Sequence, residues 1–567
     1  MATMPKFSDE KQTKKLQYYY YMSILFTIFI SSTLSHAEQI KSSQSHFAKY
    51  FYKEPSITSF PSKACKNTPY PSACQTLFKD SITFPRNKQA LFDRSVAHSI
   101  SEINSARSLA YNISTAASSK VTGHHFASAL NDCLDLLDDT IDLLSSVVSY
   151  GKDTKMGLKA PENDDDIHTW LSAALTNQET CLDGLEKHHI DGAITSTAKA
   201  LSQLTSNSLS LFLSTSKPNK NIRGGRRLLS DGGEGFPAWV SAADRKLLEA
   251  SVEEIEPHAV VAKDGSGTHG SIGEALDHLA ASMASGGRSV IYVKAGTYNE
   301  YIKIPTKQKN VLLYGDGKGK SIIVGSKNSE AGSTTYNSAT VGAMGDGFIA
   351  KDITIMNSAG PYKHQAVALR VGSDRSVVYR SSIIGYQDTL YTHSKRQFYR
   401  ETDIYGTVDF VFGNSAVVFQ SCNIVARKPP SGGLKNFVTA QGRSSPDQNT
   451  GISIHNCRIS AAPGSQTYLG RPWKQYSRTV IMESYLDGSI SPSGWYPWSG
   501  GFALKTLFYA EYRNTGPGAS TGRRVNWAGY HPSLTAPQAN SFTVAGFISG
   551  NAWLPSTGVS FDSGLLG

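Results

Sequence analysis

The chain has 567 residues, too many for one ordinary domain, and its 39% hydrophobic and 18% charged residues are typical of a globular rather than a disordered protein. The net charge of +10 suits an acidic partner, whether nucleic acid, anionic lipid or acidic polysaccharide, or it serves solubility alone. No run of Lys and Arg is interleaved with aromatic residues, which argues against nucleic acid.

Residues 1–37 have the layout of a secretory signal. Lys14 and Lys15 precede an apolar run at 18–30, and small residues follow it. The run is short for a membrane span, which needs about 20 residues, and both a cleaved signal and a retained anchor remain open. Export predicts that the six cysteines form three disulfides. It also makes Asn112, in the sequence Asn-Ile-Ser, a glycosylation site.

Residues 38–61 form a linker, and a helical pattern follows at 62–214. Apolar residues there recur at steps of three and four, as on one face of a helix. The first such series is Leu130, Leu134, Leu137, Ile141, Leu144 and Val148. A similar stripe runs from Ile167 to Leu185, and 193–213 is a third helical segment. The pattern predicts an antiparallel all-α helix bundle whose stripes form its core rather than a cofactor site.

Four of the six cysteines fall in this bundle. Cys65 and Cys74 are close enough in sequence to staple an N-terminal hairpin. Cys133 and Cys181 lie on different predicted helices, which a disulfide between them would tie together. No CxxC sequence occurs, so a zinc ribbon or a thioredoxin-like site is excluded.

Residues 215–235 form a second linker, rich in Lys, Arg, Gly and Ser. It contains the sequence Arg226, Arg227, Leu228, Leu229. A basic doublet in an exposed linker is a good target for a processing protease. The alternative is a linker that is merely solvated.

Residues 236–567 consist of short β-rich runs separated by turns with Gly and Asn, and no long helices lie between them. Doubly wound α/β structure is therefore excluded. A sandwich or barrel and a parallel β-helix both fit this spacing. The repeated pattern Ile-x-Ile-x-Asn at 353–357 and 452–456 favours the β-helix.

Three segments in this part place polar residues in apolar, aromatic surroundings: 385–391, 405–413 and 469–473. Asp388 and Asp409, in the first two, are 21 residues apart, about one large coil of a β-helix. Stacked coils would bring these carboxyl groups together. Paired carboxyls in different surroundings can serve as an acid and as a base or nucleophile.

The neighbouring residues suit that chemistry. Asp409 lies in an apolar run and needs a partner if ionised, which Arg471 can supply as a bidentate pair. Gln387 and Gln365 offer neutral donors to a developing oxyanion. An aspartate in a glycine-rich turn is more often an Asx turn, and this structural alternative stays open for Asp388 and Asp409.

These segments resemble the pectin methylesterase (pectinesterase) family. Five motifs occur in the family order within 259–529: 296–300, 365–370, 385–391, 405–413 and 469–473. The helical region with its four cysteines is similar to the pectin methylesterase inhibitor family. The sequence Asp-Gly-Ser-Gly-Thr-His-Gly at 264–270 departs from the family pattern, which often has an aromatic residue and a Lys there, but touches no proposed catalytic group.

The resemblance implies an all-β right-handed parallel β-helix with neither a metal nor an organic cofactor, preceded by a four-helix inhibitor-like bundle. It implies that Asp409 attacks the methyl ester carbonyl of a galacturonate in pectin. Gln387, helped by Gln365, would stabilise the oxyanion. Asp388 would protonate the departing methanol and then activate water. Arg471 would hold Asp409 ionised.

The resemblance further implies that Trp473 and Thr335 contact the substrate, methyl-esterified homogalacturonan. It implies a monomer secreted to the plant cell wall, cut at 226–229 by a subtilisin-like protease, with separate inhibitor proteins as further partners. The helical pro-region is expected to inhibit until this cut is made. Cys422 and Cys457 are expected to pair.

Two rival functions remain. The first is another polyuronide enzyme: a lyase would need calcium-binding carboxylates and a base, and a glycosidase would need carboxylates flanking a glycosidic bond. The second is a non-enzymatic inhibitor or wall-binding module with an inactive esterase domain, against which the intact Asp388, Asp409, Gln387 and Arg471 argue.

Overall fold

The computed structural model describes residues 63–77, 85, 87–118, 124–149, 164–190, 192–215, 255–282, 287–429 and 435–567. All of these belong to one compact unit, Pro61–Gly567. The expected signal at 1–37, the linker 38–61 and the expected processing sequence 226–229 lie outside the described residues. No helix within the described ranges has the length and apolar character needed to cross a membrane.

The predicted helix bundle is present. After the short α3 (Pro71–Thr76), its long helices within the described residues are α4 (Lys88–Ser118), α5 (His124–Val148), α6 (Asp164–Lys187) and α7 (Ala193–Thr215). Each of these long helices packs against two of the others. Leu137, Leu144, Leu171 and Phe212 meet in the bundle core, because apolar residues three and four positions apart share a helix face. Asn112, the expected glycosylation site, lies exposed on α4.

The described residues from 259 onwards form a right-handed parallel β-helix, as predicted, in which every paired strand is parallel. The 11-stranded sheet contains β1 (Ala259–Val261), β2 (Ser289–Val293), β5 (Val311–Gly315), β8 (Ile349–Lys351), β11 (Ser376–Tyr379), β14 (Arg396–Arg400), β17 (Ala416–Gln420), β20 (Gly451–His455), β23 (Arg478–Met482), β25 (Phe508–Tyr512) and β26 (Tyr530–His531).

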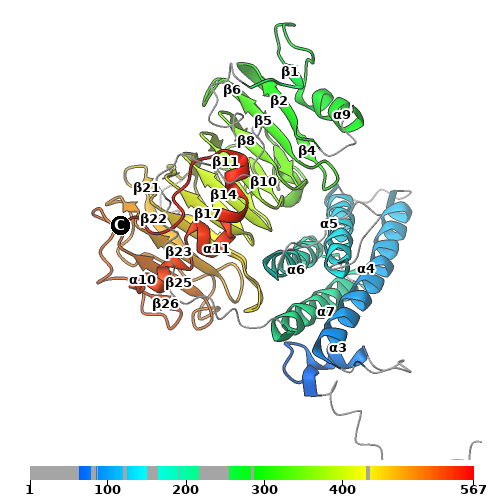
Figure 1. Cartoon of the computed structure of the whole chain (residues 1–567). Helices are drawn as coiled ribbons and strands as arrows, with labels where there is room; N and C mark the ends of the chain where they lie inside the picture. The colour runs from blue at the N-terminus through cyan, green and yellow to red at the C-terminus, as the bar shows by residue number, and fades with distance from the viewer. Residues whose placement is uncertain are drawn as a thin grey trace, which may run out of the picture. The chain divides into compact units, whose positions relative to one another are not determined.

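The 8-stranded sheet contains β3 (Gly296–Asn299), β6 (Ser321–Gly325), β9 (Thr354–Asn357), β12 (Ser382–Ile384), β15 (Asp403–Gly406), β18 (Asn423–Ala426), β21 (Arg458–Ala461) and β24 (Tyr485–Leu486). The 7-stranded sheet contains β4 (Ile302–Ile304), β7 (Val341–Ala343), β10 (Leu369–Val371), β13 (Leu390–Thr392), β16 (Val411–Gly413), β19 (Lys435–Gln441) and β22 (Gln466–Gly470). Figure 1 shows these strands following one another coil by coil, from green to orange.

The turns from the 11-stranded to the 8-stranded sheet repeat one backbone feature. A single residue with a left-handed backbone, φ between 46° and 55°, follows the strand in successive coils: Asp352, Arg380, Glu401, Ser421, Asn456, Glu483 and Arg513. This turn interrupts the β-rich run at 348–355. The backbone at Asp352 divides that run into β8 and β9, which lie in different sheets.

Short helices complete this domain: α9 (Ile272–Ser282), α10 (Ala536–Asn540), α11 (Val544–Ile548) and the 3-10 turns η2 (Tyr336–Ser338), η3 (Gly550–Ala552) and η4 (Leu554–Thr557). The helix α11 lies beside β17 (Figure 1). Its Val544 and Ile548 pack in one cluster with Val418 and Phe398 and so cover part of the 11-stranded sheet.

Two of the three expected disulfides form, Cys65–Cys74 and Cys133–Cys181. The expected Cys422–Cys457 pair is wrong for this structure, because both are buried free thiols. They follow β17 and β20 at matching positions, and each thiol donates to a carbonyl of the preceding coil. Cys422 reaches Tyr399 and Cys457 reaches Phe419, each at 3.5 Å. The two cysteines are neighbours that remain thiols, since the backbone N–H of Cys422 donates to Cys457 Sγ at 3.3 Å.

Stacked side chains form the interior of the β-helix. Strand registers align the fully buried Ile355, Ile383, Ile404, Ile424 and Ile459 in successive coils. Replacement of Ile424 by Ala should lower the free energy of unfolding by about 3 kcal/mol, because it leaves a cavity between two neighbours that cannot close. Ile424→Val, the matched control, should cost about 1 kcal/mol. Denaturant unfolding measures both, and equal costs would contradict the stacking.

Candidate active site

The register of the 7-stranded sheet brings Asp388 and Asp409 to equivalent positions. Leu390 pairs with Val411, so the residues two positions earlier also match. The backbone N–H of Asp388 donates to the carbonyl of Val408 at 3.0 Å. The carboxyl groups therefore stand on adjacent coils, at the turns that lead into β13 and β16.

Both aspartates have a left-handed backbone, with φ of 59° at Asp388 and 51° at Asp409. Aspartate is one of the few residues other than Gly that adopts this conformation readily. Both aspartates therefore do lie in turns, which is the structural alternative that the sequence analysis left open. At the same time both residues line one cavity of about 440 Å³, so their position in a turn does not remove them from the site.

Arg471 holds Asp409 from a third coil. It follows β22, and its Nε and terminal nitrogen donate to the two carboxylate oxygens of Asp409 at 2.8 and 2.7 Å. The guanidinium also lies over the rings of Phe437, at 4.2 Å, and Trp498, at 4.4 Å. A bidentate pair of this kind fixes the orientation of a carboxylate and favours its ionised form.

The surroundings separate the two carboxyl groups. Burial raises the pKa of Asp388 well above its ordinary value, and the charge of Asp409 raises it further. Burial also raises the pKa of Asp409, but the hydrogen bonds and charge of Arg471 oppose that rise. The arrangement therefore keeps the proton on Asp388 and the negative charge on Asp409.

The remaining predicted residues, Gln387, Gln365, Thr335 and Trp473, also line the cavity. The Gln365 Oε1 accepts a hydrogen bond from Ser329 at 2.8 Å, which leaves its amide N–H groups free to donate. Together with Asp388, Asp409 and Arg471, all seven residues predicted to act on substrate border the same space. Within the described residues, no three His, Cys, Asp or Glu side chains are placed to hold a metal ion.

Comparisons with known proteins agree with this geometry. Residues 258–551 match the family model described as Pectinesterase, and residues 59–211 match the model described as Plant invertase/pectin methylesterase inhibitor. A relative from Arabidopsis thaliana, "Probable pectinesterase/pectinesterase inhibitor 35", is 62% identical over 84% of this chain and 88% of its own. The chain belongs to the pectinesterase family. It is an enzyme of that class, a carboxylic ester hydrolase, with an N-terminal inhibitor-like domain.

Two further relatives cover different parts of this pectinesterase. "Pectinesterase 2" from Citrus sinensis is 48% identical over 88% of this chain and 94% of its own. The solved structure of the pectin methylesterase from carrot is 52% identical and has a TM-score of 0.53. The match covers 56% of this chain and 99% of the solved carrot chain.

The inhibitor-like bundle supplies one wall of the pectinesterase cavity. Residues of α5 and α6 line it beside Asp388 and Asp409, among them Asp132, Thr180, Asp183 and Lys187. Burial lowers the pKa of Lys187, and the charge of Asp388 opposes that fall in part. Apolar contact continues alongside, where Leu130 and Cys133 pack in one cluster with Tyr391 and Phe412.

A polar stripe on α6 makes most of the directed contacts to the β-helix. Thr176 Oγ1 accepts from Asn414 at 2.9 Å, Thr180 bonds to His393 at 3.0 Å, and Asp183 accepts from Lys474 at 2.6 Å. The residues of this stripe are three or four positions apart in the sequence: Asp166, Thr169, Ser172, Thr176, Thr180, Asp183 and Lys187. They form one face of the helix.

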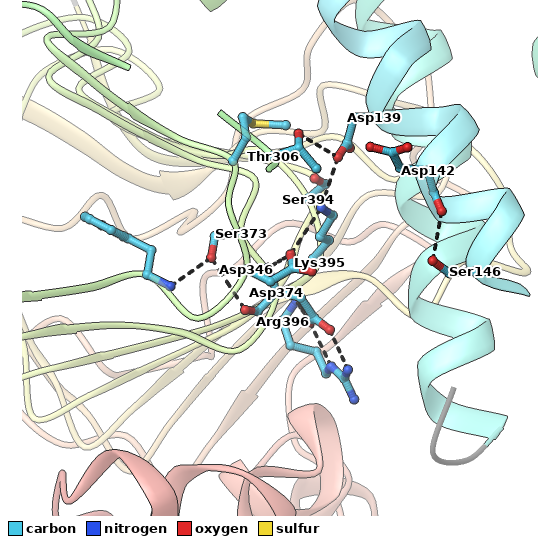
Figure 2. Close-up of polar contacts among 12 residues, drawn as sticks. Asp139, Asp142, Ser146, Thr306, Asp346, Ser373, Asp374, Ser394, Lys395 and Arg396 are labelled. Atoms are coloured by element: carbon cyan, nitrogen blue, oxygen red, sulfur yellow. Dashed lines mark hydrogen bonds and ion pairs between the residues drawn. The ribbon is translucent and has the colours of Figure 1, made fainter. Parts of the chain in front are cut away.

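Outside the cavity, buried ion pairs fix the bundle to the β-helix. Lys395 Nζ lies 3.3 Å from Asp139 of α5 and 3.4 Å from Asp346 (Figure 2). Its neighbour Arg396 donates at 2.6 Å both to Asp166 of α6 and to Asp374. Each of these two cations therefore has one carboxylate from the bundle and one from the β-helix.

The sequence analysis missed the polar stripe of α6 because it interpreted that helix through its apolar residues alone. A signal was present: Thr and Ser recur at helical spacing among the apolar residues, where a solvent-exposed face would carry more charge. Lys395 and Arg396 gave no comparable signal, because their carboxylate partners lie in four separate segments of the chain.

Removal of Arg471 tests the electrostatics of the pair. Arg471→Gln leaves a buried carboxylate at Asp409 without its partner, so the free energy of unfolding at neutral pH should fall by about 3–5 kcal/mol. The folded-state pKa of Asp409 then lies further above its unfolded value. The free energy of unfolding of the variant falls as pH rises through that pKa. Its deficit relative to the wild type should therefore shrink as pH is lowered towards about 4.

Denaturant unfolding across that pH range measures this effect. The double variant Arg471→Gln/Asp409→Asn is the matched control, since it removes the charge together with its partner and should recover most of the loss at neutral pH. A deficit of equal size at both ends of the pH range would mean that Asp409 is not the group involved.

Proposed function

We propose that this pectinesterase hydrolyses the methyl esters of homogalacturonan in the plant cell wall, with Asp409 as nucleophile and Asp388 as acid and base. The observation that carries the proposal is the pair of carboxyl groups on adjacent coils, which line one cavity and differ in that Arg471 opposes the rise in pKa at Asp409. One is suited to give a proton and the other to attack.

In the first half of the reaction, a carboxylate oxygen of Asp409 attacks the ester carbonyl at C6 of a galacturonate. A carboxylate has about four lone pairs, and Arg471 binds one on each oxygen of Asp409. Each oxygen therefore keeps a lone pair with which it can attack. The amides of Gln387 and Gln365 donate to the tetrahedral oxyanion. Its collapse breaks the bond to the methoxy group, which takes the proton of Asp388 and leaves as methanol.

In the second half, Asp388 is ionised and takes a proton from water. That water attacks the same carbonyl, the bond to Asp409 breaks, and the product leaves as a carboxylic acid that loses its remaining proton to the solvent and becomes galacturonate. Asp409 returns to its pair with Arg471, and Asp388 holds a proton again. Trp473 and Thr335, on the cavity wall, are placed to contact the sugar.

The bundle acts as an inhibitory pro-region in this proposal. It walls the cavity and places Lys187 towards Asp388, so a polymer chain has no path across the catalytic carboxyls while the bundle is bound. The chain would be exported through the signal at 1–37, cleaved or kept as a membrane anchor. A subtilisin-like protease would cut at Arg226, Arg227, Leu228, Leu229, and the released monomeric domain would then be open to separate inhibitor proteins.

Substitution of Asp409 tests the catalytic assignment. In a chain cut at an introduced protease site at 226–229, Asp409→Asn should reduce methanol release from methylated pectin by about 10⁴-fold or more, because an amide is a poor nucleophile. Asp403→Asn is the matched control, since Asp403 lies on the same coil but pairs with Lys318 on another sheet. Retained activity in Asp409→Asn would exclude it as the nucleophile.

The inhibitory role is tested on the uncut chain. Asp139→Asn with Asp166→Asn removes both anchoring carboxylates, while Lys395 and Arg396 keep Asp346 and Asp374. Weaker binding of the bundle should raise methanol release from the uncut chain by about tenfold or more, and cutting should add little further.

Asp138→Asn is the control for that experiment, because Asp138 lies on α5 and pairs with Arg107 inside the bundle. Its uncut chain should stay as inactive as the wild type. Equal activity of the uncut and cut wild-type chains would refute inhibition by the bundle.

A further inference from the structure

Asp409 and Arg471 belong to coils that are not adjacent, and one strand lies between them. Asp409 precedes β16, Arg471 follows β22, and β19 pairs with both strands. Neighbouring strands are about 4.8 Å apart, so the arginine has to cross β19 to reach the carboxylate. Val411 pairs with Thr439, so the residues two positions earlier, Asp409 and Phe437, lie side by side. Phe437 is therefore the residue that Arg471 crosses.

The backbone of Phe437 holds the turn that carries Asp409. Its N–H donates to the carbonyl of Thr407 at 3.1 Å, and its carbonyl accepts from the N–H of Phe410 at 3.3 Å. The two bonds lie on either side of Asp409, whose backbone is left-handed with φ of 51°. The position of this turn therefore depends directly on Phe437.

The side chain of Phe437 supports Arg471. Its ring centre lies 4.2 Å from the Cζ of the guanidinium, and the ring centre of Trp498 lies 4.4 Å from the same atom. Tyr468 stacks on the Phe437 ring with centres 5.8 Å apart, and Tyr496 packs against it at 5.3 Å. Phe437 is only 5% exposed, so water screens little of the attraction between its ring and the cation.

An aromatic ring suits the place beneath this guanidinium. Arg471 already donates two N–H groups to Asp409. A carboxylate at 437 would compete with Asp409 for those groups, and an aliphatic side chain would fill the space without attracting the charge. The face of a phenyl ring attracts the cation and offers it no lone pair. The ring can therefore fix the arginine and leave both hydrogen bonds to Asp409 in place.

We propose that Phe437 is a positioning residue for the ester hydrolysis, which holds Asp409 through its backbone and Arg471 through its ring. The inference rests on the proposed function and adds a residue to it that acts only through these two. Among the described residues, Arg471 and Trp498 border the cavity and Phe437 does not.

The titratable groups around Asp409 come from several elements. Burial raises the pKa of Asp409, and Arg471 opposes that rise. Burial and the charge of Asp409 raise the pKa of Asp388 before β13, and both also raise the pKa of Tyr509 on β25. While the bundle is bound, its titratable side chains on the cavity wall are Asp132, Asp183, Glu186, Lys187 and His188. Loss of the Phe437 ring should act on Asp409 through Arg471.

Phe437→Leu in the cut chain tests this role. The kcat for methanol release from methylated pectin should fall about tenfold, because a loosely held arginine orients the carboxylate less well. KM should stay within about twofold, since the ring does not border the cavity. Phe437→Met, which fills more of the space but also lacks an aromatic face, should behave alike. Unchanged kcat in both variants would overturn the proposal.

The pH profile of kcat distinguishes positioning from a loss of packing. Asp409 must be ionised to attack, so activity appears as pH rises through its pKa. An Arg471 that is held less firmly lowers this pKa less, and the acid limb of Phe437→Leu should therefore lie higher by about half a pH unit or more. An acid limb at the wild-type position would contradict the proposal.

Phe419→Leu is the matched control. Phe419 is a fully buried ring on β17 of the 11-stranded sheet, where it stacks on Tyr399 at 4.7 Å. Its replacement should lower the stability of the β-helix and leave the acid limb of kcat in place. An equal shift of the acid limb in Phe437→Leu and Phe419→Leu would show a general loosening of the fold and would also overturn the proposal.

A double-mutant cycle tests the contact without any measurement of activity. Denaturant unfolding is followed for the full chain with Phe437→Leu, with Arg471→Gln and with both changes. Removal of the ring should raise the unfolding constant about tenfold more when Arg471 is present than when it is absent. Strictly additive effects would show that the ring does not hold the arginine.

The wild-type cut chain separates this inference from the proposed function. Methanol release by the wild type, with Phe437→Leu equal to it in kcat and acid limb, would refute the positioning role alone. A wild-type chain that releases no methanol would refute the proposed function instead, whatever the double-mutant cycle shows.

Discussion

The parallel register between adjacent coils is the constraint on which the site depends. Pairing of Leu390 with Val411 sets Asp388 beside Asp409, and pairing of Thr439 with Gly470 two strands further on sets Arg471 where it can reach Asp409. A shift of one residue in either register would turn these side chains to the other face of the sheet. The stacked isoleucines of the interior hold that register, so the stability of the β-helix and the geometry of the site have the same origin.

The bundle uses the same surface in a different way. Its contact with the β-helix combines a polar stripe on α6, a few apolar residues and ion pairs such as Asp139 with Lys395. Release of the bundle would leave Lys395 with Asp346 and Arg396 with Asp374, so the β-helix would not be left with unpaired buried cations. A contact of this kind can bind firmly and still separate into two parts whose exposed faces water can solvate.

Much of the fold could be predicted from the sequence because its signals are local. Leu130, Leu137 and Leu144 mark one helix by their spacing, and the short β-rich runs separated by turns mark the coils. The two Ile-x-Ile-x-Asn segments do not mark equivalent positions, because 353–357 ends in β9 of the 8-stranded sheet and 452–456 follows β20 of the 11-stranded sheet into its turn. The grouping of Asp388, Asp409 and Arg471 could be predicted from ordered motifs together with coil length. The contacts of Lys395 could not, because they depend on docking between distant segments, which leaves no periodic pattern. The free thiols of Cys422 and Cys457 could not either, because the sequence places them on neighbouring coils but does not show whether they bond.

The central claim is that Asp409, and not Asp388, forms a covalent bond with the substrate. Mass spectrometry of the cut chain, acid-quenched within the first turnover of methylated oligogalacturonate, tests it most directly. The account predicts that methanol forms in an amount near that of the enzyme and that the galacturonoyl group is found on the peptide carrying Asp409. An adduct on any other residue, or turnover of Asp409→Asn at the wild-type rate, would contradict it.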